Sequence, residues 1–285
     1  MRGLTPFFAP TPFFAPTVAL VHDRAESDPH RYVSLEQIRK RALGHGYRVE
    51  TFQLGQGGFS ASRVQGILEA RNIRGVLLSV TSSASPAAKL HFSKLAVVTF
   101  GFGLSTPSLH RASTNVTEGM LAIFTLLQER GYRRIGLVIT PWDNFRAEHT
   151  YSGALLHYQQ SLSKSRRLPI FSLTDPLPEE NRKAFKEWRR KYRPDVLISV
   201  NEPVLTWLAL EGLRVPEDIG LLVHDWVSIP EMNNVAGMDH RRDEVAAAAV
   251  DLLAAHLKYH EYGIPAVPRQ ILIPPKFVDG DSLRT

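Results

Sequence analysis

The chain has 285 residues, of which 44% are hydrophobic and 22% are charged, the balance of a folded protein rather than of a disordered tail. It contains no cysteine, which excludes a disulfide framework and a thiolate zinc site. Its length favours two domains of ordinary size.

The formal net charge of +6 permits an attraction to nucleic acid or to another acidic partner, but does not select one. Much of the excess lies in residues 182–193, RKAFKEWRRKYR. Phe185 and Trp188 are three residues apart in this run. The spacing predicts an amphipathic helix whose basic face is solvated.

The N-terminal segment, residues 1–16, contains the tandem repeat TPFFAP and is rich in proline. Proline at this density blocks a regular helix, and the apolar stretches are too short for an export signal or a membrane span. We expect an extended leader that packs poorly, or the remnant of a linker. Without an export signal, the cytoplasm is the expected location.

Short β-branched runs alternate with helical patterns along the rest of the chain. The patterns predict strands at 18–21, 48–52, 74–80, 96–100, 134–139, 168–173, 195–200, 219–223, 235–238 and 269–273. They predict helices at 32–46, 60–71, 116–130, 146–162, 179–192 and 244–259, and a further helix that ends at Gly212.

This alternation is typical of βαβ units and of an α/β fold with mostly parallel sheets. The number of units exceeds one ordinary sheet, so we expect two similar, Rossmann-like lobes. Open parallel sheets bind ligands beyond the carboxyl ends of their strands, and the residues at those ends are therefore the candidates for a binding site.

Common catalytic and cofactor motifs are missing from the sequence. There is no G-x-x-x-x-G-K-[ST] phosphate loop, no G-x-G-x-x-G dinucleotide fingerprint, and no G-x-S-x-G nucleophile elbow. His256 and His260 have metal-ligand spacing on a helix, but no glutamate accompanies them, and we interpret them as a solvated pair. We therefore expect no catalytic set, no cofactor and no metal.

Three groups of polar and aromatic residues directly follow predicted strands. They are Asn201-Glu202, His224-Asp225-Trp226 and Asp239-His240. Amide and carboxylate oxygens accept hydrogen bonds from vicinal hydroxyls, and a tryptophan face stacks on the C–H surface of a sugar. Each group alone could equally be a helix cap or a turn. Together they indicate a pocket.

Three segments resemble the lac-repressor/galactose-repressor family of bacterial transcription regulators. They are NVTEGMLAIFTLLQERGYRRIGLVI (residues 115–139), PDVLISVNEP (194–203) and VPEDIGLLVHDW (215–226). The likeness is to the sensor domain of these regulators, which has the type I periplasmic-binding-protein fold, and it covers about residues 17–283.

The resemblance implies two lobes joined by a hinge of three crossovers. One lobe would comprise 17–140 and 241–267, and the other 141–240 and 268–285. It further implies that Asn201 and Asp225 contact an effector between the lobes, that His240 lines the same cleft at a crossover, and that the protein is a homodimer with an N-terminal helix-turn-helix that reads DNA.

The sequence departs from the family pattern at three places. Thr150 to Gly153 replace the usual R-x-x-G, and Arg146, one turn earlier, could substitute for the missing arginine. Trp226 replaces the second aspartate of an Asp-Asp pair and makes the expected pocket more aromatic. No helix-turn-helix precedes residue 17, so we expect DNA binding only if such a domain is supplied upstream or by a partner.

The sequence therefore predicts the effector-sensing core of a transcription regulator that is not an enzyme and does not enter a membrane. The expected effector is a small molecule of the sugar class, a sugar or sugar derivative. A stand-alone solute-binding protein is the alternative. The predicted ligand-binding residues are Asp23, Trp142, Arg146, Asn201, Asp225, Trp226 and His240.

Overall fold

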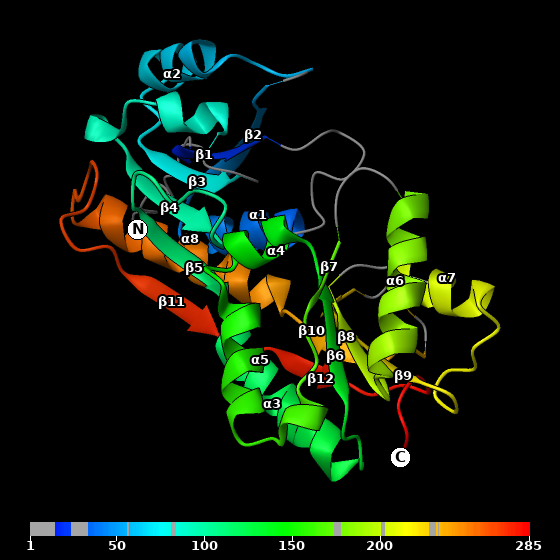
Figure 1. The fold of residues 1–285 in the computed structure, drawn as a ribbon. Coiled ribbons are helices and arrows are strands. Elements are labelled where there is room, and N and C mark those ends of the chain that lie inside the picture. The colour runs from blue at the N-terminus through cyan, green and yellow to red at the C-terminus, as the bar shows by residue number, and fades with distance from the viewer. Residues whose placement is uncertain are drawn as a thin grey trace, which may run out of the picture.

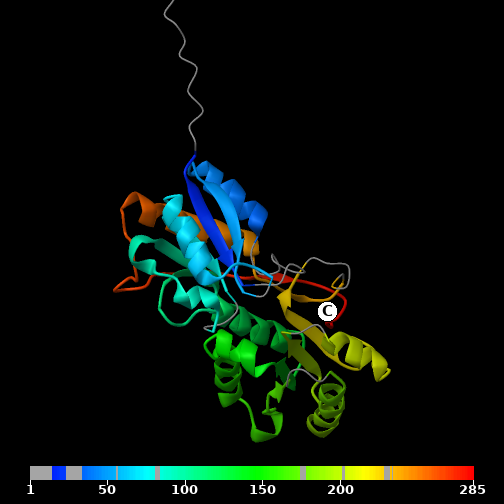
Figure 2. The same cartoon turned by 90° about the horizontal axis from the view of Figure 1, so that it is seen from above.

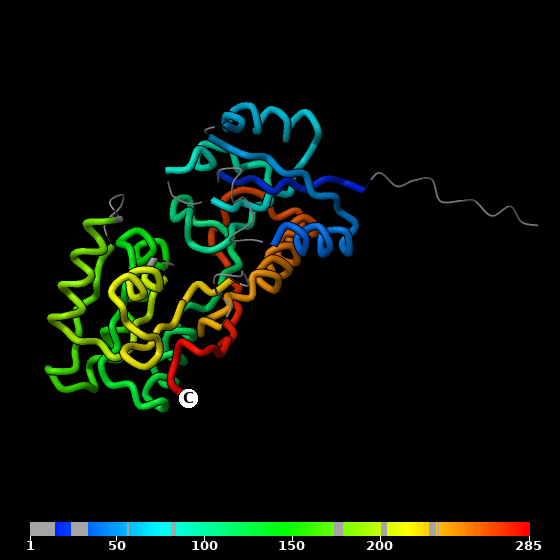
Figure 3. The backbone as a smooth tube through the Cα atoms, turned by 90° about the vertical axis from the view of Figure 1, so that its right-hand side faces the viewer, coloured from blue at the N-terminus to red at the C-terminus, as the bar shows by residue number. Residues whose placement is uncertain are grey.

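The computed structural model describes residues 15–23, 34–55, 57–80, 84–173, 178–200, 203–227, 232 and 234–285. The leader up to residue 14 and the predicted ligand-binding residue Asn201 lie outside these ranges. Figures 1 and 3 show that the chain forms two lobes. Each lobe is built around its own six-stranded sheet, covered by helices. Within the described ranges, no helix is long and apolar enough to span a membrane.

The sheet of the first lobe has the strand order β11-β5-β4-β3-β1-β2, and every pair of neighbours is parallel. The three strands β1, β3 and β4 in the middle of this sheet are apolar runs buried on both faces, as expected for a sheet that helices cover on each side. Its strands are β1 (Thr17–His22), β2 (Arg48–Gln53), β3 (Gly75–Ser79), β4 (Ala96–Phe100), β5 (His110–Thr114) and β11 (Gln270–Ile273).

Two hydrophobic clusters flank this sheet, one on each face. One contains α2 (Ala61–Ala70) and the short 3₁₀ turns η1 (Pro86–Lys89) and η2 (Phe92–Lys94). The other contains α1 (Leu35–Gly44) and the long α8 (Arg242–Lys258), which packs along β3, β4 and β5. The first lobe is thus a three-layer sandwich that the C-terminal part of the chain completes (Figure 2).

The sheet of the second lobe has the order β12-β10-β9-β8-β6-β7. All described pairs are parallel except that β12 runs antiparallel to β10. Its strands are β6 (Ile135–Ile139), β7 (Phe171–Ser172), β8 (Val196–Ser199), β9 (Gly220–Trp226), β10 (Gly237–Asp239) and β12 (Lys276–Val278).

Helices cover both faces of this second sheet as well. On one face lie α3 (Val116–Glu129) and α5 (Thr150–Gln160), and on the other lie α6 (Pro178–Tyr192) and α7 (Pro203–Leu210). The prediction for the basic run is confirmed, because α6 buries Phe185 and Trp188 while its cations are exposed or half-buried. The short elements α4 (Pro141–Arg146) and η3 (Lys164–Arg166) complete the lobe.

The chain crosses between the sheets three times, after β5, after β10 and after β11. Hydrogen bonds join the crossovers. The Thr114 hydroxyl donates to the His240 carbonyl at 2.8 Å, and the Asn115 amide donates to the Ile273 carbonyl at 2.8 Å. The three strands of the hinge are therefore one connected unit rather than three independent linkers.

The strand partners place the lobe boundaries elsewhere than predicted. The first crossover lies at Asn115, not at 140, because β6 pairs with β8 of the second sheet. The third lies after Ile273, not at 267, because β11 pairs with β5 of the first sheet. The first boundary was misplaced because β5 was not predicted. Its sequence, HRAST, lacks the apolar residues that mark a buried strand.

Two other local predictions are wrong. The helix predicted over 146–162 begins only at Thr150, since Glu148 and His149 have left-handed backbone angles (φ 52° and 59°) that separate α5 from α4, which ends at Arg146. His256 is buried, not solvated. Its Nδ1 pairs with Glu261 and its ring stacks on His110, with ring centroids 4.0 Å apart.

Gly220 provides a test of the packing between β9 and Tyr132. A Cβ at Gly220 would lie 2.4 Å from the Tyr132 hydroxyl, and this hydroxyl is held by the Arg284 amide at 2.9 Å. We expect Gly220→Ala to lower the free energy of unfolding by about 1–3 kcal/mol through overpacking. Urea denaturation measures the change.

Gly153→Ala is the matched control, because Gly153 lies in α5 with no atom within 4 Å of the added methyl group. Removing a glycine from a helix should leave stability unchanged or raise it by up to about 1 kcal/mol. Equal losses in both variants would contradict the packing explanation.

Candidate functional site

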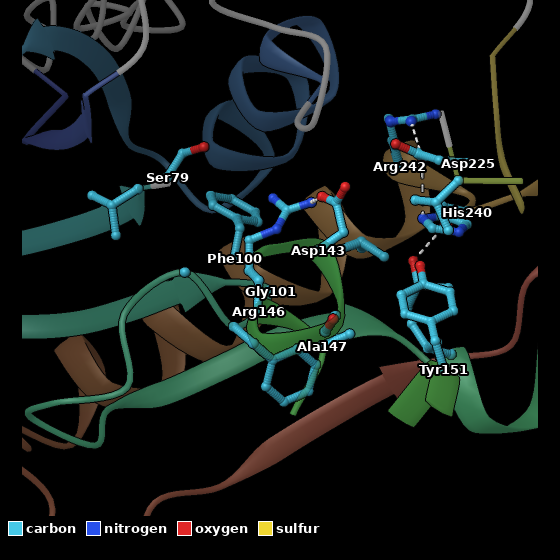
Figure 4. Close-up of a pocket in the computed structure, with 18 residues that line it drawn as sticks. Ser79, Phe100, Gly101, Asp143, Arg146, Ala147, Tyr151, Asp225, His240 and Arg242 are labelled. Carbon is cyan, nitrogen blue, oxygen red and sulfur yellow. Dashed lines mark hydrogen bonds and ion pairs between the residues drawn. The ribbon is translucent and has the colours of Figure 1, made fainter. Parts of the chain in front are cut away.

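A cavity of about 120 Å³ lies between the lobes, at the carboxyl ends of the parallel strands. The first lobe contributes residues that follow β3, β4 and β5, and the second contributes residues from α4 and α5 and from the ends of β8 and β9 (Figure 4). The eighteen lining residues are Ser79, Val80, Phe100, Gly101, Phe102, Gly103, Ser113, Thr114, Val116, Asp143, Arg146, Ala147, Tyr151, Val200, Asp225, His240, Arg242 and Val245.

Arg111 builds the first-lobe wall of this pocket. Its buried guanidinium donates to the carbonyls of Gly101 and Leu104, at 3.2 and 3.3 Å, and stacks on the Phe102 ring at 4.7 Å. Burial lowers the pKa of Arg111, and the two carbonyls each accept one hydrogen bond from a terminal nitrogen of the guanidinium, while its buried Nε has no hydrogen-bond partner among the described residues. The residue thereby fixes the loop that presents two glycines and an aromatic ring to the cavity.

On the second-lobe side, α4 projects a charged pair into the pocket. The Thr140 side chain caps this helix by accepting from the Asp143 amide at 2.9 Å, and its hydroxyl donates to the Asp143 carboxylate at 2.7 Å. Arg146 lies 3.6 Å from that carboxylate, a distance that allows the guanidinium to turn toward a ligand. Figure 4 shows the two side chains pointing toward one another near Phe100.

A second charged group connects the lobes at the hinge. Asp225, at the end of β9, accepts from the Arg242 guanidinium at 2.6 Å, and Arg242 begins α8 of the first lobe. His240, on the crossover between them, has its Nδ1 3.3 Å from the same carboxylate oxygen. Burial raises the pKa of Asp225, but His240 and Arg242 outweigh burial and hold that pKa below its ordinary value.

The network continues into the core of the second lobe through His224. The Nδ1 atom of His224 lies 3.1 Å from His240 Nε2 and 3.1 Å from the Tyr151 hydroxyl. Because Asp225 orients the Nδ1–H of His240, its Nε2 is an acceptor, and His224 then donates from Nδ1. The result is a chain of Asp225, His240, His224 and Tyr151 that starts and ends at the pocket.

Burial lowers the pKa of both histidines in this chain. The pKa of His224 lies well below its ordinary value, because the ring is fully buried and His240 is adjacent. Burial also lowers the pKa of His240, and Asp225 offsets only part of that effect. The chain is therefore neutral at its histidines and negative at Asp225, where Arg242 supplies the countercharge.

Three of the predicted ligand-binding residues line the cavity together: Arg146, Asp225 and His240. Trp226 does not, because β9 continues through it and adjacent strand residues point to opposite faces. Its indole donates to the Val235 carbonyl at 3.0 Å. Trp142 is 43% exposed, and neither Trp142 nor Asp23 is among the residues that line the cavity.

Sequence reasoning missed Asp143, Tyr151 and Arg242, and it noticed His224 without assigning it to the site. Arg242 had a usable signal, since it directly follows the crossover at His240 and heads a helix. Within the described ranges, no group of three or more metal-ligating side chains is close enough to hold an ion.

Fold and site define a two-lobed α/β binding protein with a polar cavity at the hinge. Residues 124–283 match the family described as the periplasmic binding protein-like domain, and the chain belongs to this family. A search of curated proteins by sequence found no match.

Solved structures share the fold over nearly the whole chain. A regulatory protein of the LacI family from Chloroflexus aggregans is 16% identical, with a TM-score of 0.68 and coverage of 93% of this chain and 98% of that one. The transcriptional regulator CelR in complex with cellobiose is 18% identical, with a TM-score of 0.67 and coverage of 93% and 84%.

A LacI-family regulator from Weissella paramesenteroides with bound glucose is 15% identical, with a TM-score of 0.69 and coverage of 94% and 98%. The family resemblance that the sequence motifs indicated thus has a counterpart in three dimensions. At these identities the likeness establishes the two-lobed architecture.

The lowered histidine pKa values predict a loss of stability in acid. A histidine that is neutral in the folded protein binds a proton more readily when unfolded. Its contribution is therefore present above about pH 6.5 and is lost as the pH falls. The pKa of His110 is lowered to about 4, by burial first and then by His256 and Arg269. We expect the urea midpoint to fall steadily between pH 6.5 and pH 4.

His110→Asn should make this pH dependence shallower, because asparagine does not titrate. Its side-chain oxygen can still accept the hydrogen bond that the Arg269 amide donates to His110 at 2.9 Å. His157→Asn is the control on an exposed position of α5. An identical pH dependence in His110→Asn and in the unmodified protein would contradict the assignment.

Proposed function

We propose that this chain is the effector-sensing part of a transcription regulator, and that it binds a small carbohydrate in the cavity between its lobes. The observation that carries the proposal is the position of the cavity, which both lobes line and which the hinge residues Asp225, His240 and Arg242 border. A ligand bound there contacts the same hinge residues that hold the two lobes in position relative to each other.

The lining chemistry supports a polyhydroxylated ligand. Asp143 and Asp225 supply carboxylate acceptors, Arg146 and Arg242 supply donors, and Ser79, Ser113 and Thr114 add hydroxyl groups. Phe100, Phe102 and Tyr151 provide aromatic surface for the C–H face of a sugar ring. Relatives of the same fold have been solved with cellobiose and with glucose.

The ion pair between Asp225 and Arg242 supplies a mechanism for sensing. It links the end of β9 in the second lobe to the start of α8 in the first. A ligand whose hydroxyls replace part of this pairing would bind one relative position of the lobes better than another. Such a difference in affinity is what shifts an equilibrium between two conformations.

The output of this switch would be DNA binding, through a helix-turn-helix supplied upstream or by a partner. Regulators of this kind act where the DNA is, so the proposal places the protein in the cytoplasm. It also includes a homodimer and no catalytic turnover. An α/β enzyme would instead need a nucleophile with its activator or a matched acid and base in the cavity.

A thermal-shift screen with glucose, cellobiose and a panel of related mono- and disaccharides tests the proposal. A ligand at about 100 times its Kd stabilises the folded state by about 2.7 kcal/mol, which is a rise in Tm of several degrees for a chain of this size. We expect such a rise for at least one sugar, and chromatography should recover that sugar unchanged.

Arg146→Gln should weaken binding of the same sugar about 10- to 100-fold, since it removes a charge-assisted hydrogen bond of about 1.5–3 kcal/mol. Asp225→Asn preserves the side-chain volume and should also suppress the Tm rise. Arg63→Gln, on the exposed face of α2, is the control. Unaltered stabilisation in both pocket variants would remove this cavity as the binding site, and conversion of the sugar would favour an enzyme.

The homodimer is tested by size-exclusion chromatography with light scattering. We expect twice the mass of one chain at micromolar concentration, with and without the sugar. A single-chain mass under both conditions would contradict this part of the proposal.

A further inference from the structure

A dense group of cations lies at the amino ends of the strands of the second sheet, opposite the carboxyl ends that border the cavity. We call each row of strand ends an edge of the sheet. The strands β8, β6 and β7 are neighbours in the sheet and run parallel, so their first residues share one edge. The segments that precede them are 190–195, 133–134 and 163–170. The cavity lies at the other edge, where Val200 and Asp225 follow β8 and end β9.

Arg134 holds these three segments in contact. Its guanidinium donates to the carbonyls of Ser165 at 2.5 Å and of Arg193 through Nε at 2.9 Å, and also to the carbonyl of Tyr192. One side chain therefore braces η3 and the end of α6 against the start of β6. The positions of the neighbouring cations are set by this brace and not by a long loop.

Seven exposed basic residues surround the brace, and we call them the basic edge. None of the seven has a salt-bridge partner among the residues that the structure describes. The formal net charge of the whole chain is +6, so this edge alone carries as much positive charge as the protein has in excess. The basic edge consists of Arg133, Lys164, Arg166, Arg167, Arg190, Lys191 and Arg193.

The carboxylate at this edge does not neutralise the cations. The two carboxylate oxygens of Asp195 accept hydrogen bonds from the backbone amides of Arg133 and Arg134, at 2.8 and 2.9 Å. Elsewhere on α6, Arg182 binds Glu179 and Arg189 binds Glu211. The cations at the end of the helix that meets Arg134 have no such carboxylate partner among the described residues.

We propose that the basic edge binds the phosphate backbone of duplex DNA without sequence preference. Five of its seven residues are arginine, whose planar guanidinium matches phosphate oxygens with two parallel hydrogen bonds. Contacts of this kind supply affinity and orientation on the duplex but carry no sequence information. The second lobe would then rest on DNA while the opposite edge of the same sheet faces the effector.

The surroundings of the basic edge favour a duplex over other polyanions. Single-stranded nucleic acid needs exposed aromatic rings on which bases stack, but Tyr132 is buried, Tyr158 is 9% exposed, and the half-buried ring of Tyr192 lies under the Lys191 ammonium. A membrane surface would favour exposed apolar side chains beside the cations, and the large exposed apolar residues of the described chain lie in other segments.

Fluorescence anisotropy of a labelled 30-base-pair duplex of arbitrary sequence, titrated with the 285-residue chain, tests the proposal. We expect a Kd of about 1–100 µM that weakens steeply as the salt concentration rises. The triple variant Arg133→Gln, Arg166→Gln and Arg193→Gln should bind at least about tenfold more weakly and should reduce the slope of log K against log salt by about 2–3.

Two further variants separate charge at this edge from net charge and from folding. The control Arg39→Gln, Lys40→Gln and Lys94→Gln removes the same charge from exposed positions of the first lobe and should bind DNA nearly as the unmodified chain does. Lysine at 133, 166 and 193 should restore most of the affinity. Thermal melting checks that each variant is folded.

The proposal is overturned if the duplex fails to bind at 50 mM salt, or if the control loses as much affinity as the glutamine variant at the basic edge. It is also overturned if vesicles with 30% phosphatidylserine bind more tightly than the duplex. Because the two sites lie at opposite edges of the sheet, failure of the sugar screen leaves this test unaffected.

Discussion

The arrangement of the two lobes depends on one half-buried ion pair, that between Asp225 and Arg242. The carboxylate belongs to the last strand residues of one lobe and the guanidinium to the first turn of the long helix of the other. A short, partly dehydrated pair of this kind is costly to break on one side, because a lone buried charge remains. The pair therefore resists any separation of the lobes that does not offer each group a new partner.

The hinge crossovers explain why this constraint can still serve as a switch. Bonds from Thr114 to His240 and from Asn115 to Ile273 tie the three crossing strands together, so the hinge bends as a unit. His240 is part of that unit and also touches Asp225 and His224. A ligand that competes for Asp225 therefore acts on the ion pair and on the hinge at the same time.

The histidine chain behind the pocket is a second consequence of the same geometry. Two buried neutral imidazoles cost less than two buried charges, and their hydrogen bonds fix which nitrogen carries the proton. His224 leaves its Nε2 without a partner in the core, next to Gly119. Protonation of this nitrogen would place a charge and an unpaired N–H in the core. Burial therefore lowers the pKa of His224, and the ring stays neutral.

The sequence predicted the parts of this arrangement that depend on local pattern. Apolar runs gave most strands, and polar residues at strand ends gave Asp225 and His240. It failed where a three-dimensional partner decides the outcome. The strand β5 is fully buried although it contains histidine and arginine, because Arg111 finds carbonyl acceptors in a loop that sequence cannot place.

The prediction that Trp226 lines the pocket failed for a different reason. Its position directly after Asp225 suggested a shared pocket, but β9 does not end at Asp225. Strand alternation turns one side chain toward the cavity and the next toward Gly237, where the indole packs so closely that a Cβ on that glycine would lie 2.6 Å from it. A prediction of which residue contacts a ligand therefore requires the end of the strand to be placed to within one residue.

The polarity of the parallel sheet connects the two proposed sites. Parallel strands gather all their carboxyl ends at one edge and all their amino ends at the other, so residues that are distant in sequence collect into two separate groups. At one edge the second lobe presents Asp225, with its countercharge from the first lobe. At the other it presents cations without described countercharges, ordered by Arg134. A protein that binds a small neutral molecule and a polyanion would keep the two sites apart, and in this lobe the length of the strands separates them.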